Sequence, residues 1–116
     1  METLTLEPSH VETLFASFSP KIRLVFFNTC RSLDIARHLT TKGVVELAIG
    51  VAATIPDDHA IRFANTFYRA LSDGRSVQTA FELAGLQLNG LEAASRPELL
   101  AADGVKPDDV VFAVRT

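Results

Sequence analysis

The sequence predicts an α/β domain with a short, mostly parallel sheet flanked by helices. Two nearly continuous apolar runs, at residues 22–27 and 44–51, have the length and composition of buried parallel strands. A helical pattern at residues 32–42 lies between them, so strand, helix and strand form a βαβ unit, for which we expect a right-handed crossover. Two further helical patterns follow this unit and complete the α/β character.

Length and composition limit the classes of protein that need to be considered. The 116 residues predict a single domain, 1–116, and the net charge of −3 with scattered Lys and Arg gives no basic face for nucleic acid. No apolar run approaches the ~18 residues of a membrane span, and no secretory signal is recognisable. The single cysteine argues against a disulfide-stabilised secreted scaffold, so a cytoplasmic location is expected.

The first segment predicts an extended stretch and then a helix. Residues 3–6 alternate between polar and apolar side chains, which allows a short edge strand. Ser9 and Glu12 form a capping box, and Pro20 ends the helix that they begin. The apolar side chains of this helix recur at helical spacing, at Val11, Leu14, Phe15 and Phe18.

The βαβ unit carries two features that bear on a site. The first strand is followed directly by Asn28, Thr29 and Cys30, and strand ends of this kind lie at the sheet edge where open α/β folds place their chemistry. Gly43 is a natural end for the helix that follows. Gly50, inside the second apolar run, indicates a bend or a close approach of another backbone.

The second half of the chain predicts two helices and a final strand. Asp57 and Asp58 open the longest helix, where aspartates cap free amides and favour the positive end of the helix dipole. Ser76 caps a further helix that ends at Asn89–Gly90. Residues 91–109 are less regular, and residues 110–114 predict the last strand.

Cys30 is the first candidate for a reactive group. The start of the following helix and the neighbouring Arg31 both favour a thiolate, which is the nucleophilic form of cysteine. The structural alternative is that Cys30 is a buried thiol that packs as a small hydrophobic side chain.

Three histidines are candidates for the base that would activate this thiol. His10 lies in an exposed first turn, and His38 lies near a helix C-terminus, where a cation complements the dipole. No spacing singles out one of the three. His59 is the candidate base of most interest, because it follows the carboxyl end of the second strand. No metal-ligand spacing, Gly-rich phosphate loop or G-x-S-x-G motif occurs, so no metal or cofactor is predicted.

The segment Val25–Ser32, reading VFFNTCRS, is similar to the LNAC-x-S segment of CHAT-type proteins, which are bacterial relatives of caspases and separases. The resemblance runs from about Leu6 to Val114. The remaining segments that carry it are Ile49–Gly50, Ile55–Asp57, Ala60–Ala64, Phe67–Leu71 and Gly74–Phe81.

This resemblance implies a three-layer caspase-like fold with a Cys–His dyad that cleaves peptide bonds. Cys30 occupies the position of the nucleophile, Asp57 falls where the family has an acid, and Asp57 and Arg31 are candidate substrate-binding residues. The strand that carries the family's catalytic His–Gly motif has no counterpart here, and none of the three histidines is followed by glycine. The oxyanion-stabilising amide of that glycine is therefore missing as well.

The chain is therefore expected to correspond to the second, C-terminal half of a caspase-like domain. The first expectation is a non-catalytic binding or regulatory module in a bacterial signalling or defence system, acting as a homo-oligomer or with a partner protein that covers the exposed sheet edge. A second is a cysteine peptidase with Cys30 as nucleophile and a histidine base from another chain. A third is an unrelated small α/β interaction module. No nucleic-acid or membrane partner is expected.

Overall fold

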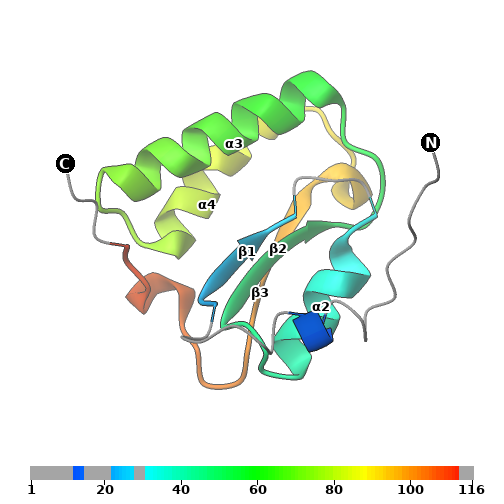
Figure 1. The fold of residues 1–116 in the computed structure, drawn as a ribbon. Coiled ribbons are helices and arrows are strands. Elements are labelled where there is room, and N and C mark those ends of the chain that lie inside the picture. Colours follow the sequence, from blue (N-terminus) through cyan, green and yellow to red (C-terminus); the bar gives the residue numbers. More distant parts are fainter. Residues whose placement is uncertain (1–11, 15–21, 28–30, 113–116) are drawn as a thin grey trace.

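A computed structural model describes residues 12–14, 22–27 and 31–112. Within these residues a sheet of three strands has the order β1–β2–β3 (Figure 1). β1 is Leu24–Phe26, β2 is Leu47–Val51 and β3 is Pro97–Ala101. β1 and β2 are parallel, and β3 runs antiparallel to β2, so the sheet is mixed. The predicted α/β class, with a short sheet flanked by helices, is confirmed. The described sheet is mixed rather than mostly parallel, because β3 pairs antiparallel with β2.

Two helices cover one face of the sheet. α3, Asp57–Ser72, and α4, Val77–Gly85, lie over this face (Figure 1). They share a buried apolar cluster with the sheet. A short 3₁₀ helix, η1, extends α4 over Leu86–Leu88. The buried cluster on this face consists of Leu47, Ile49, Val51, Ile55, Ala60, Phe63, Phe67, Ala70, Leu71, Val77, Ala80, Ala84, Leu88 and Val110.

One helix covers the opposite face. α2, Leu33–Thr41, connects β1 to β2 and buries a second, smaller cluster of Ala36, Leu39, Val45 and Ala48. The alternation of side chains along β2 sends Ala48 to this cluster and Leu47 and Ile49 to the other, as a strand with a period of two requires. The molecule therefore has three layers, with the sheet between α2 and the α3–α4 pair (Figure 1).

Two helix starts differ in how they are capped. Ser76 is the N-cap of α4 and its hydroxyl accepts a hydrogen bond of 3.1 Å from the Thr79 amide, as predicted. The N-cap of α3 is Pro56, with no side-chain hydrogen bond, and Asp57 and Asp58 lie in the first turn. The predicted capping role of these aspartates is wrong, although their charges still favour the positive end of the helix dipole.

The C-terminal part of the sheet differs from the prediction. β3 lies in the stretch predicted to be irregular. The last strand, predicted at residues 110–114, is wrong for residues 110–112, the part of it that the structure describes. Val111 forms an isolated antiparallel bridge with Ser76. β3 begins with Pro97 and Glu98, residue types that are depleted in strands, and only an edge position accommodates them.

Arg96 fixes the connection that leads into β3. Its guanidinium donates to the Leu88 carbonyl oxygen at 2.9 Å and to the Gly85 carbonyl oxygen at 3.2 Å, which satisfies acceptors at the end of α4 and of η1. The first predicted strand, at residues 3–6, and the Ser9 cap lie outside the described residues. None of the helices in the described ranges has the length and apolar character needed to cross a membrane.

Candidate functional site

The predicted nucleophile, Cys30, lies outside the described residues, and so do Asn28 and Thr29. Ser32, the residue that precedes α2, makes hydrogen bonds at the ends of both parallel strands. The Ser32 amide donates to the Val51 carbonyl oxygen at 2.8 Å, and its hydroxyl accepts from the Val51 amide at 3.1 Å. The same hydroxyl donates to the Phe27 carbonyl oxygen at 3.4 Å. Ser32 thereby joins the ends of β1 and β2 to the start of α2.

The loops at this edge of the sheet contact one another. The Arg31 amide donates to the Ala53 carbonyl oxygen at 3.2 Å, and the Ala53 amide donates to the Ala94 carbonyl oxygen at 3.0 Å. Arg31 has a positive φ of 58°, a left-handed backbone conformation that is uncommon for a residue with a side chain. The segments that follow β1 and β2 and precede β3 therefore meet at the carboxyl edge of the parallel strands.

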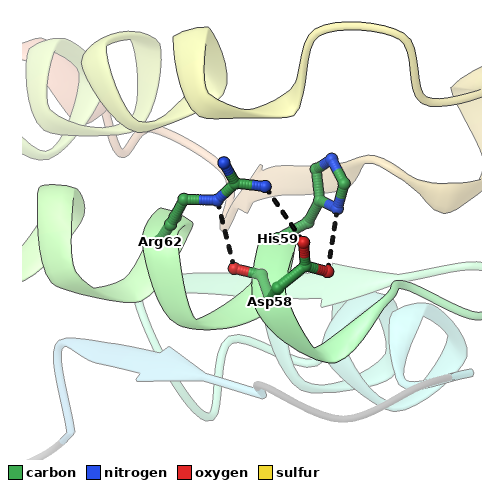
Figure 2. A network of polar contacts seen from close by, with 3 residues as sticks. All are labelled: Asp58, His59 and Arg62. Atoms are coloured by element: carbon green, nitrogen blue, oxygen red, sulfur yellow. Dashed lines mark hydrogen bonds and ion pairs between the residues drawn. The ribbon is translucent and has the colours of Figure 1, made fainter.

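The side chain of the candidate base, His59, belongs to a polar cluster in the first turns of α3 (Figure 2). Nδ1 of His59 lies 3.2 Å from Oδ1 of Asp58, and Arg62 donates to Oδ2 of Asp58 at 3.2 Å. The His59 side chain is 22% exposed, whereas that of Asp58 is 70% exposed. A carboxylate bound to one ring nitrogen orients an imidazole and leaves the other nitrogen able to exchange a proton.

Among the described residues, the remaining candidates form no side-chain hydrogen bond or ion pair with this cluster of Asp58, His59 and Arg62, although Asp57 precedes Asp58 in the first turn of α3. Arg31 and Asp57 are both exposed and take part in none of the ion pairs formed between described residues. The structure thus brings His59 together with Asp58 and Arg62, which the sequence did not indicate. The i, i+4 spacing of Asp58 and Arg62 was the available signal for their ion pair.

The contacts of Asp58 lower its pKa. Loss of hydration is the largest single effect and raises the pKa of this carboxyl, but the hydrogen bonds from His59 and the charges of His59 and Arg62 together outweigh it. The pKa therefore lies below the ordinary value of 3.8. Because the folded pKa is depressed, the ion pairs contribute stability above pH 3.8 and lose it as the pH falls through the folded pKa.

Asp58→Asn is expected to lower the melting temperature slightly at neutral pH, with a difference from the natural chain that disappears in acid and shrinks in high salt. Thermal unfolding from pH 2.5 to pH 7 measures this difference. Asp57→Asn is the matched control, since it removes a neighbouring first-turn charge and leaves the His59 and Arg62 contacts in place. An equal decrease in melting temperature in both variants would assign the effect to the helix dipole instead.

His38 lies in the last turn of α2, as predicted, but it has a specific partner. Its Nε2 atom lies 2.6 Å from Oε2 of Glu12, which ties the helical residues 12–14 to α2. A shallow hollow of about 290 Å³ lies beside it, lined by Asp34, Arg37, His38, Thr41 and Lys42. Among the described residues there is no group of three or more His, Cys, Asp or Glu side chains able to hold a metal ion.

The outer edge of β1 has no strand partner within residues 12–14, 22–27 and 31–112. β1 has a single neighbour, β2, among the described strands. Its three residues are all only partly buried, whereas all five residues of β2 are buried. Phe26 nevertheless lies in an aromatic group, with ring centroids 5.5 Å from Phe67 and 5.8 Å from Tyr68. The edge is therefore apolar, well anchored and incompletely covered.

Comparison with known proteins adds no assignment. No protein-family model matches the chain. A search of curated proteins finds no matching relative either. Any assignment of function therefore depends on the geometry described above and on the resemblance of the segment around Cys30.

Proposed function

We propose that this chain is a CHAT-like, non-catalytic binding or regulatory module that acts as an oligomer or with a partner protein covering the outer edge of β1. The observation that carries the proposal is the contrast between the two parallel strands. Both have the composition of central strands, yet β2 is buried along its whole length and β1 is partly exposed along its whole length. Natural proteins cover or block an apolar strand edge of this kind.

The two edges of the sheet differ in a way that supports this proposal. β3, at the opposite edge, begins with Pro97 and continues with the exposed Glu98, and both residue types discourage pairing with a further strand. β1 carries neither proline nor charge within Leu24–Phe26. Among the described strands, β3 therefore carries residues that discourage further pairing and β1 does not, which supports β1 as the edge that a partner covers.

The resemblance of the segment around Cys30 supports a caspase-like origin, and the absence of the family's His–Gly motif from the sequence supports a role without catalysis. A cytoplasmic, bacterial setting fits the single cysteine and the same resemblance. The partner's surface is expected to be protein, because it has to supply backbone hydrogen bonds and apolar side chains to a strand edge.

The second candidate function is a cysteine peptidase with Cys30 as nucleophile. One observation favours it: the Asp58 carboxylate holds Nδ1 of His59, as an orienting acid does in catalytic dyads and triads. In the form that the sequence predicts, the base comes from another chain. The form with His59 as base predicts an activated thiol in the isolated chain, and the form with a base from another chain predicts one in the complex. The binding module requires neither.

Alkylation of Cys30 separates the two functions. We expect the rate of reaction with iodoacetamide, followed by mass spectrometry between pH 5 and pH 9, to rise along the profile of an ordinary thiol with a pKa of about 8.5, or more slowly if the thiol is buried. His59→Asn is expected to leave this profile unchanged. The urea-unfolded chain, in which the thiol is fully accessible, gives the reference rate.

A reactivity plateau below pH 7 that His59→Asn removes would contradict the non-catalytic proposal and favour an activated dyad. So would cleavage of any protein substrate by the chain or its partner complex that Cys30→Ala abolishes. These outcomes concern the thiol alone, so they do not depend on which molecule binds the β1 edge.

A further inference from the structure

We propose that a second copy of the chain occupies the outer edge of β1, which has no partner among the described strands, with the two β1 strands pairing antiparallel about a two-fold axis at Val25. The two three-stranded sheets then join into one continuous sheet. This inference rests on the proposed binding function and specifies its partner.

The hydrogen bonds between β1 and β2 determine which backbone groups are available. The Arg23 carbonyl oxygen accepts from the Leu47 amide at 2.8 Å, and the Phe27 amide donates to the Ile49 carbonyl oxygen at 2.9 Å. Backbone groups alternate in direction along a strand. The amide and carbonyl of Val25 therefore also face β2, and those of Leu24 and Phe26 point away from it.

These outward groups match those of a second β1. In an antiparallel pair centred on Val25, Leu24 lies opposite Phe26 of the second copy, and each residue exchanges an N–H···O bond in both directions with its opposite. Between the two Leu24–Phe26 pairs, Val25 lies opposite Val25 of the second copy at a non-hydrogen-bonded position. Every outward donor and acceptor of β1 therefore finds a partner in an identical strand.

The side chains are complementary as well. Leu24 and Phe26 pack against the α3–α4 cluster, and Val25 packs against the α2 cluster. Pairing places Leu24 beside Phe26 of the second copy on one face and two valines together on the other, which are favourable cross-strand pairs. Tyr68, 52% exposed and next to Phe26, extends the aromatic surface at this seam.

The charges select the antiparallel arrangement. Arg23 is the one charged residue in the segment 22–27. Its Nε atom lies 2.7 Å from Oε2 of Glu46, and its Cζ atom lies 5.7 Å from the ring centroid of Phe112. An antiparallel pair sets the two arginines at opposite ends of the interface. A parallel pair would place them side by side, where like charges oppose pairing.

Sedimentation velocity across a concentration series tests the association. The natural chain is expected to double its mass as the concentration rises through the micromolar range. Leu24→Pro removes an outward amide and spares the β1–β2 ladder, so we expect it to remain monomeric with a cooperative thermal transition. Leu99→Pro removes an outward amide on the β3 edge, since Leu99 lies opposite Ile49, whose backbone groups face β1. It is the matched control and is expected to dimerise like the natural chain.

Disulfide trapping tests the register without relying on the proline variants. In the Cys30→Ser background, Val25→Cys is expected to give a covalent dimer on oxidation, because Cα atoms at a non-hydrogen-bonded antiparallel position lie about 4.5 Å apart, within disulfide range. Ile61→Cys, on an α3 position that is 57% exposed, is the control and is expected to stay monomeric.

A chain that is monomeric at every concentration, or a dimer in which Val25→Cys forms no more crosslink than Ile61→Cys, would overturn this inference. Binding of a different protein to the edge of a monomeric chain would also overturn it, while leaving the proposed binding function standing. Failure of the proposed function is recognised separately, by an activated Cys30 thiol.

Discussion

Phe67→Ala is expected to lower the free energy of unfolding by about 3–5 kcal/mol, a loss typical of large core aromatics. Phe67 has no exposed surface and lies at the centre of the core between α3 and the sheet. Its ring makes an edge-to-face contact with Phe26 at 5.5 Å and stacks on Phe63 at 6.1 Å. Truncation removes this burial and the geometry-specific ring contacts together.

Urea unfolding followed by far-UV circular dichroism measures the Phe67 effect. Ile61→Ala is the matched control, since Ile61 is an apolar residue of the same helix that is 57% exposed. Its loss is expected to be below about 1 kcal/mol, because little of the side chain leaves water on folding. Equal losses in the two variants would mean that the helix does not bury the face assigned here.

Gly50→Ala is expected to destabilise the fold by about 2–3 kcal/mol, through overpacking at a site with no room to adjust. A Cβ atom on Gly50 would lie 2.9 Å from the Leu33 Cα atom and 2.9 Å from the Ser32 carbonyl oxygen. Both atoms are backbone, at the start of α2, and Gly50 lies in the central strand. The helix would have to move away from the sheet to admit a single methyl group.

Gly85→Ala is the control and is expected to act in the opposite direction, with a gain of about 0.4–1 kcal/mol. Gly85 has helical dihedral angles, φ −59° and ψ −26°, and an added Cβ meets Arg96 at an ordinary contact distance of 3.8 Å. Unfolding of both variants in urea compares the two signs directly. If Gly50→Ala left the free energy of unfolding unchanged, α2 would not lie against the central strand in this way.

The parts of the fold that were predictable are those where burial leaves a pattern. β2 is buried on both faces, so its sequence is a continuous apolar run, and the amphipathic spacing of α2 and α3 follows from their single buried faces. The close approach at Gly50, inferred from a glycine inside an apolar strand, is confirmed. β3 was missed because an edge strand needs little burial, and Pro97–Glu98 does not resemble a strand locally.

The candidate site was predictable only in outline. Strand ends locate the carboxyl edge of a parallel sheet. Arg31 contacts Ala53 in the loop after β2, and Ser32 contacts Val51, the last residue of β2, so the start of α2 and the end of β2 meet at this edge. The pairing of His59 with Asp58 depends on side-chain rotamers in the first turn of a helix, which residue spacing does not specify. The exposure of β1 depends on which strands lie beside it, and its own composition, typical of a central strand, predicts the opposite.

The most direct test of a free β1 edge is amide hydrogen exchange measured by NMR at several protein concentrations. In the dilute chain, the Leu24 and Phe26 amides are expected to exchange much faster than those of Val25 and Phe27, which face β2. Raising the concentration is expected to slow exchange at Leu24 and Phe26 as the edge becomes paired. Uniform protection of all four amides in the dilute chain, independent of concentration, would contradict a free edge and the binding role proposed for it.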